Sequence, residues 1–142
     1  MIVLVILALS ADQLLKHWAR TVLAPLGSID IIKDFFKLTY VENRGGAFGI
    51  MQGKTFVFVT AVFLVIAFMY SQRELIKNDN IMRISCIFLL TGAVANLTDR
   101  LLFGFVTDMF DFYGIWKFVF NLADIYVVVS TFLIAYRIIK TE

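Results

Sequence analysis

The chain has 142 residues, of which 61% are hydrophobic and 17% are charged, and its mean hydropathy is +0.86. This composition lies outside the usual range of soluble proteins and indicates a polytopic membrane protein, with one domain over residues 1–142. The net charge of +2 gives no reason to expect nucleic acid as a partner, and the single cysteine, Cys86, excludes an intrachain disulfide.

Four apolar stretches are long enough to cross a membrane as helices, which takes about 20 residues. They cover residues 1–23, 55–71, 82–98 and 116–136. We expect helices rather than strands, because an isolated strand cannot satisfy its backbone hydrogen bonds in lipid. No basic residue precedes the first apolar run, so we expect a retained span there and not a cleaved signal peptide. The expected fold class is therefore an all-α membrane protein with four transmembrane helices.

The connections between these spans differ in character. Residues 24–54 are too long and too apolar for a simple tether. Within them "FFKLTYV" is rich in aromatic and β-branched residues, and "ENRGG" is typical of a turn. They predict a small β-structured cap at the membrane surface, between the first and second spans. Residues 72–81 are predicted to form a water-facing turn, and residues 100–115 an interfacial segment.

The order of the spans gathers the unusual polar residues at one membrane face. Four alternating spans place both termini on one side, here called side one, and the cap on the opposite side two. Spacings of three or four residues predict shared helix faces for three sets. These sets are Asp12 with Lys16, Gly92 with Asn96 and Arg100, and Asn121 with Asp124. Ionisable residues inside spans usually mark a functional site, although interhelical hydrogen bonds and ion pairs that only hold a bundle together remain the alternative.

Carboxylates are the most numerous candidate catalytic groups in this polar cluster. A single histidine and a single cysteine cannot supply a zinc site, and no serine lies near a base at a useful spacing. Two carboxylates close together in a low-dielectric site cannot easily both ionise, so one keeps its proton while the other acts as a base, as in an aspartyl hydrolase. Asp108 and Asp124 are the natural pair by position. The alternatives that spacing leaves open are Asp12, Asp99 and Asp111.

Five motifs in chain order resemble those of the bacterial lipoprotein signal peptidases, also called signal peptidase II. They are "ADQLLK" (11–16), "ENRGGAFG" (42–49), "TGAVANLTDR" (91–100), "GFVTD" (104–108) and "FNLAD" (120–124). The resemblance implies an aspartic endopeptidase, without metal or organic cofactor, that removes the signal peptide of a diacylglyceryl-modified prolipoprotein just before its lipidated cysteine. The family's catalytic aspartates fall on Asp108 and Asp124. Its supporting and substrate-binding residues fall on Asp12, Lys16, Asn43, Gly92, Asn96, Asp99, Arg100 and Asn121. Asp111 adds a carboxylate that the family's motif does not explain.

The same resemblance implies partners and a location. The expected partners are the lipid-modified prolipoprotein, membrane lipids and globomycin-type inhibitors, and the chain is expected to act as a monomer. The family works at the outer face of the bacterial cytoplasmic (inner) membrane, which would put side two outside. The positive-inside rule alone gives the opposite orientation, because five basic residues lie on side one and eight on side two. This rule is weaker for a long folded cap. The alternative function is a non-enzymatic membrane protein, such as a proton-coupled carrier or an assembly factor, against which the one-sided clustering argues.

Overall fold

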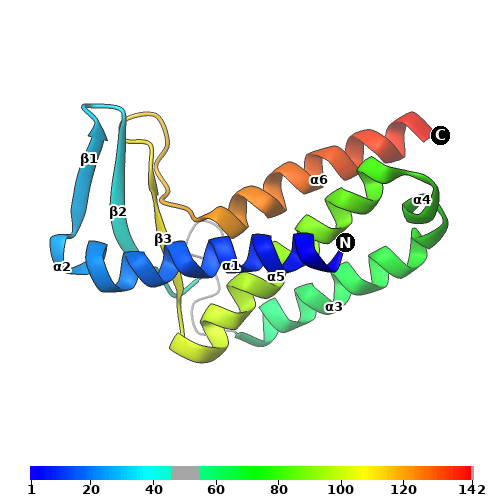
Figure 1. Cartoon of the computed structure of the whole chain (residues 1–142), viewed down its shortest axis with the longest axis horizontal. Helices are drawn as coiled ribbons and strands as arrows, with labels where there is room; N and C mark the ends of the chain where they lie inside the picture. The colour runs from blue at the N-terminus through cyan, green and yellow to red at the C-terminus, as the bar shows by residue number, and fades with distance from the viewer. Residues whose placement is uncertain (46–54, 142) are drawn as a thin grey trace.

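The chain folds into a bundle of helices with a small antiparallel sheet at one end (Figure 1). The computed structural model describes residues 1–45 and 55–141. Both chain ends point away from the sheet. Residues 46–54, the last part of the predicted cap, lie outside the described residues.

Three helical segments in the described part of the chain are long and apolar enough to cross a membrane. They are Ile2–Leu26, Asn80–Phe103 and Leu122–Lys140. The first is built from α1 (Ile2–Trp18), the π-helical turn η1 (Ala19–Leu23) and α2 (Ala24–Leu26). A further apolar helix, α3 (Thr55–Ser71), has 17 residues and is shorter than the other three segments.

Two helices have other boundaries than the sequence predicts. The third predicted span, 82–98, is part of a longer helix, α5 (Asn80–Phe103). The Asp79 side chain caps its start by accepting a hydrogen bond from the Met82 N–H (3.0 Å), and Gly104 ends it in the left-handed conformation (φ 79°). The last span, predicted over 116–136, is instead α6 (Leu122–Thr141), because Phe120 still pairs with Phe110 through two backbone hydrogen bonds.

The predicted cap contains strands, but the sheet also takes a strand from elsewhere. Strands β1 (Ser28–Ile32) and β2 (Phe36–Asn43) lie within the predicted cap. Strand β3 (Val106–Asp111) comes from the connection before α6, which the sequence predicts as an interfacial segment, and it pairs antiparallel with β2. The sheet order is β1-β2-β3, so the fold is mostly helical with a small three-stranded sheet, of which the predicted cap supplies two strands. The predicted turn at 72–81 also contains a short helix, α4 (Arg73–Asn78).

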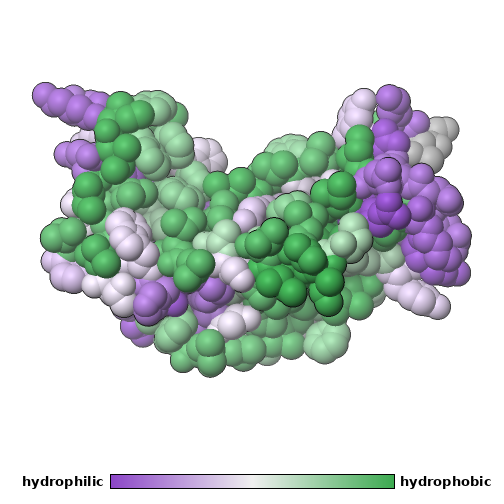
Figure 2. Space-filling view, in the orientation of Figure 1, coloured by the Kyte–Doolittle hydropathy of each residue, from purple (hydrophilic) through white to green (hydrophobic). Residues whose placement is uncertain are grey.

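The bundle carries its apolar side chains outward and many of its polar side chains inward. Figure 2 shows apolar residues over the middle of the bundle, with hydrophilic residues gathered at the end that bears α4. The largest fully buried side chains include Lys16, Asp12, Asp99, Asp108 and Asn121. An apolar exterior around a polar interior is the arrangement that a lipid surrounding favours.

Helices α5 and α6 approach each other closely at Gly92. A Cβ atom at this position would lie 2.6 Å from the carbonyl oxygen of Ala123 and 2.9 Å from the Val127 side chain. Only glycine leaves room for the α6 backbone at that distance. This contact therefore fixes how the start of α6 lies against α5.

Candidate active site

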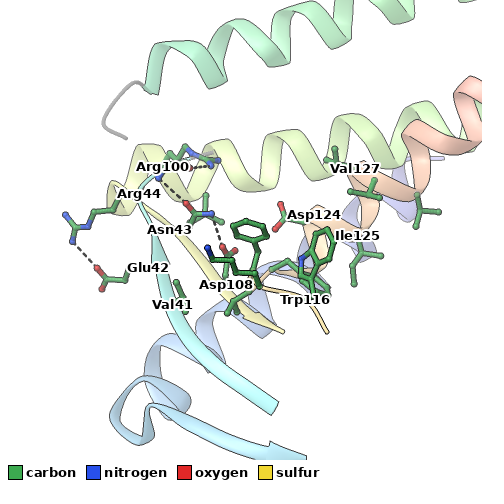
Figure 3. Close-up of a pocket in the computed structure, with 18 residues that line it drawn as sticks. Val41, Glu42, Asn43, Arg44, Arg100, Asp108, Trp116, Asp124, Ile125 and Val127 are labelled. Carbon is green, nitrogen blue, oxygen red and sulfur yellow. Dashed lines mark hydrogen bonds and ion pairs between the residues drawn. The ribbon is translucent and has the colours of Figure 1, made fainter. Parts of the chain in front are cut away.

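A pocket of about 830 Å³ lies between the sheet and the start of α6. Two aspartates line it, Asp108 from β3 and Asp124 from the first turn of α6, and Figure 3 shows both carboxylates projecting into this space. The rest of its lining includes apolar residues of α6 such as Ile125 and Val128, and the exposed indole of Trp116. The pocket thus combines two carboxylates with an apolar wall.

A reciprocal cap at the start of α6 places Asp124. The Asn121 side-chain oxygen accepts a hydrogen bond from the backbone N–H of Asp124 (2.9 Å). In return, the Asp124 carboxylate accepts one from the backbone N–H of Asn121 (3.2 Å). This is the capping-box arrangement, with Asn121 at the N-cap and Asp124 three residues later. The pair therefore starts the helix and at the same time fixes the position of the second aspartate.

Strand pairing places Asp108. It lies opposite Val41 in the β2–β3 register, next to the end of β2 at Asn43. The Asn43 side chain donates to one Asp108 oxygen (3.0 Å), and the Asn121 side chain donates to the other (2.6 Å). Asp108 is therefore held by one amide from the sheet and one from the cap of α6.

All four carboxylate oxygens of Asp108 and Asp124 accept hydrogen bonds from neutral N–H groups. The Asn96 amide supplies the remaining contact, to Asp124 Oδ1 at 2.8 Å. Among the described residues, no ammonium or guanidinium group forms an ion pair with either carboxylate. Amides stabilise a carboxylate without fixing its charge, so the pair can still take up or release a proton.

Burial raises the pKa of Asp108 to about 7. The negative charge of Asp124 acts in the same direction, while the hydrogen bonds from Asn43 and Asn121 oppose the rise. A carboxyl group that titrates near neutrality can hold a proton and still give it up during a reaction.

Two of the alternative carboxylates, Asp12 and Asp99, belong to a different cluster. The Lys16 ammonium lies 2.9 Å from Asp12 and 3.2 Å from Asp99, and all three side chains are fully buried. Gln13, which lies in the motif "ADQLLK" but is not among the predicted site residues, also donates to Asp99 (3.1 Å). The predicted proximity of Asp12 and Lys16 is confirmed as an ion pair.

Asp111, the third alternative, lies at the other end of β3. Its carboxylate accepts a hydrogen bond from the Thr39 hydroxyl (2.8 Å) and lies 3.5 Å from the Lys37 ammonium. Both partners belong to β2, so Asp111 ties the two strands together. It does not line the pocket.

Arg100 and Gly92, the other selected residues, have distinct positions. Arg100 lines the pocket and donates to the carbonyl oxygen of Gly45 (2.7 Å), and its guanidinium lies 3.7 Å from the centre of the Phe58 ring. Gly92 lies outside the pocket lining, at the crossing of α5 and α6. Apart from Gly92, the structure brings all the selected residues into the pocket or the hydrogen-bonded cluster behind it.

No group of three metal-binding side chains lies together within residues 1–45 and 55–141. The expectation that the site works without a metal or an organic cofactor stays a prediction.

Comparison with known proteins gives consistent matches along the chain. Residues 4–140 match a family model described as signal peptidase (SPase) II. The lipoprotein signal peptidase of Clostridioides difficile (strain 630) is 43% identical over 130 residues, covering 92% of this chain and 88% of that protein. The lipoprotein signal peptidase of Caldanaerobacter subterraneus subsp. tengcongensis is 41% identical over 139 residues, covering 97% of this chain and 94% of that protein.

The fold also matches a solved structure, a bacterial membrane enzyme determined by the in meso method at 1.9 Å resolution. The two chains superpose with a TM-score of 0.85 at 27% sequence identity. The match covers 99% of this chain and 93% of the other. The likeness therefore includes the sheet as well as the helical bundle.

Proposed function

Because the chain belongs to the signal peptidase II family, we propose that it is a membrane-bound aspartic peptidase that removes signal peptides from lipoproteins. The observation that carries the proposal is the pair Asp108 and Asp124, which line one pocket and, within the described part of the chain, accept hydrogen bonds only from neutral donors. Such a pair shares one proton more readily than it carries two charges.

The two aspartates carry out different proton transfers in the hydrolysis. Asp124, as the ionised partner, takes a proton from a water molecule while the water oxygen attacks the scissile carbonyl carbon. Asp108, whose pKa of about 7 leaves a large protonated fraction near neutrality, gives its proton to the carbonyl oxygen, so a neutral gem-diol forms. Asp124 then passes its proton to the amide nitrogen as the C–N bond breaks, and Asp108 regains a proton from the diol. Both aspartates end in their starting states.

The supporting residues hold this geometry and orient the substrate. Asn43, Asn96 and Asn121 donate to the two aspartates, so they keep the carboxylate planes fixed in the pocket. Arg100 lines the same pocket and presents a cation that can bind a peptide carbonyl of the substrate. Globomycin-type inhibitors occupy the same space.

The apolar wall of the pocket fits a lipid-modified substrate. Ile125, Val128 and Val129 line the pocket along α6, a helix apolar enough to span a membrane. A diacylglyceryl group can stay in lipid beside this wall while the peptide bond before the modified cysteine reaches Asp108 and Asp124. The substrate is therefore a diacylglyceryl-modified prolipoprotein, cut before its lipidated cysteine.

The whole chain forms one integral membrane peptidase domain with four spans. α3 is the additional span, since its 17 residues reach about 25 Å at 1.5 Å per residue, close to the thickness of the hydrocarbon core. The sheet and the pocket then face the outside of the bacterial inner membrane, and membrane lipids cover the bundle. The enzyme acts as a monomer, in which one chain supplies both aspartates.

The test is a gel-shift assay with the purified protein in detergent. A diacylglyceryl-modified prolipoprotein should lose its signal peptide, whereas the same precursor without the lipid should be a poor substrate. Absence of cleavage of the lipidated precursor would refute the peptidase function. Equal cleavage of the two precursors would refute the lipid dependence alone.

A further inference from the structure

Lys16 is a fully buried cation at the centre of the polar cluster behind the pocket. Its ammonium group has three N–H donors and contacts three oxygens, on Asp12 (2.9 Å), Asp99 (3.2 Å) and Asn96 (2.8 Å). Each of these partners makes a second contact that leads toward the site.

The two carboxylate partners hold the backbone beside each site aspartate. Asp12 accepts a hydrogen bond from the N–H of Ala123 (2.9 Å), the residue immediately before Asp124. Asp99 accepts one from the N–H of Thr107 (3.2 Å), the residue immediately before Asp108. One ammonium group thereby connects the start of α6 with strand β3 and fixes how the two elements lie relative to each other.

The third partner sets the direction of a hydrogen bond in the pocket. An ammonium group only donates, so the oxygen of the Asn96 amide must face Lys16. The NH2 group of the same amide must then face Asp124, to which it donates at 2.8 Å. The Asn121 side chain also donates to the Asn96 oxygen (3.2 Å), which agrees with this orientation.

We propose that Lys16 is a positioning residue of the peptidase, which sets the relative placement of Asp108 and Asp124 through Asp99, Asp12 and Asn96. The proposal rests on the proposed function, since it assigns a part in that reaction. Lys16 has no exposed surface and does not line the pocket, so these three side chains form its hydrogen-bonded and ion-pair connection to the site. Its loss should therefore lower kcat and leave KM almost unchanged.

The ion pair at the opposite end of the bundle provides a matched control. Asp79 pairs with Arg137 and so joins the start of α5 to α6, as Lys16 joins α1 to α5. The hydrogen bonds that the structure gives the Asp79 side chain reach Met82 and Arg137 and not the pocket. Asp79→Asn should lower the unfolding temperature and leave kcat unchanged.

The experiment compares wild type, Lys16→Met, Lys16→Met/Asp99→Asn and Asp79→Asn with a diacylglyceryl-modified prolipoprotein in detergent. The double variant keeps the summed formal charge of Asp12, Lys16 and Asp99 as in wild type, so it remains informative where Lys16→Met does not fold. kcat and KM are measured below the unfolding temperature of every folded variant. Asp124→Asn is the inactive reference.

The expected result is a fall in kcat of about 100-fold for each folded Lys16 variant, the scale on which misplacing catalytic groups lowers a rate, with KM within about threefold of wild type. Wild-type kcat in either folded Lys16 variant overturns the proposal, and so does unfolding of both, because a structural role would then explain the residue. A wild-type enzyme that releases no signal peptide refutes the proposed function instead.

Discussion

Two groups of aspartates lie close together at the sheet end of the bundle, and they differ in their partners. Asp12 and Asp99 share the ammonium of Lys16, in a cluster that is fully buried. Asp108 and Asp124 face a pocket and accept hydrogen bonds from asparagine side chains and a backbone N–H. An ammonium partner keeps a buried carboxylate ionised, whereas an amide leaves its protonation free to change during a reaction. The two groups of aspartates therefore differ in the type of partner, which is a cation in the buried cluster and a neutral N–H donor at the pocket.

Neutralising either pocket aspartate is the change with the largest expected effect. Asp108→Asn or Asp124→Asn should each lower kcat by about 10³-fold or more, because each removes a general acid or base. Asn retains the size of the side chain, so each variant should keep the overall fold. A gel-based time course of signal-peptide release measures both rates. Asp12→Asn, in the cluster around Lys16, is the comparison and should lower the cleavage rate less than either pocket variant. A larger loss of rate in Asp12→Asn would contradict the assignment of the pocket pair as the acid and base.

Substituting Gly92 tests whether the positions of both aspartate groups depend on the close contact between α5 and α6. α5 carries Asp99 and Asn96, α6 carries Asp124, and the two helices meet where a Cβ on Gly92 would lie 2.6 Å from the carbonyl oxygen of Ala123. Gly92→Ala should cost about 1–3 kcal/mol through overpacking and should also lower kcat, because α6 must shift. Thermal unfolding in detergent and the cleavage assay measure the two effects.

Leu101→Ala is the control for this variant, since Leu101 is an exposed residue of the same helix. It should change neither quantity appreciably. A Gly92→Ala enzyme with wild-type stability and rate would show that the close contact does not hold the site.

The pH dependence of the cleavage rate tests whether Asp108 is protonated in the active enzyme. Asp108 must be protonated to act as an acid, and its pKa is raised to about 7 by burial and by Asp124. The rate should therefore fall by about tenfold for each pH unit above about 7. A pH series of kcat/KM for the lipidated precursor measures this fall. A rate that keeps rising well above neutrality would contradict the assignment of Asp108 as the acid.

The same shift has a consequence for stability with a definite sign. The unfolded chain loses the Asp108 proton near pH 3.8, whereas the folded chain keeps it up to about 7. The folded state therefore binds more protons between these values, so the contribution of Asp108 to stability falls as pH rises through this window and is constant above it. Asp108→Asn should remove that fall. Unfolding temperatures of wild type and the variant across the window provide the test.

Asp111→Asn should have the smallest effect. Asp111 pairs with Lys37 at a partly exposed position of the sheet and lies outside the pocket lining. Losing such an ion pair costs about 1 kcal/mol or less, and the Asn side chain can still accept the Thr39 hydrogen bond. The cleavage rate should stay at the wild-type level. A loss comparable with that of Asp108→Asn would show that the carboxylates of β3 act together.

The sequence predicted the helices and the clustering of polar residues because both follow from local patterns and chain order. Apolar runs indicate the long helices, and alternating spans bring residues far apart in the chain to one end of the bundle. The spacing of Asp12 and Lys16 also predicted that the two side chains share one helix face. Chain order could not say which aspartate meets which partner, because Asp99 and Asp108 are nine positions apart and differ only in the three-dimensional contacts of α5 and β3.

The errors also have physical reasons. β3 forms through pairing with β2, more than sixty residues earlier in the chain, so no local pattern reveals it. The apolar run predicts the start of α6 too early, because it begins before Asn121 and continues past Asp124. Their spacing is itself a helix-start signal, an N-cap residue followed three positions later by an acidic one. That signal was available in the sequence.

The protonation of the four aspartates is the most direct test of the distinction between the two groups. Infrared spectroscopy of the purified protein near pH 6, below the Asp108 pKa of about 7, detects the C=O stretch of a protonated carboxylic acid. Wild type should show such a band, and the band should be lost in Asp108→Asn but kept in Asp12→Asn and Asp99→Asn. Loss of the band in Asp12→Asn or Asp99→Asn, or its persistence in Asp108→Asn, would contradict the account.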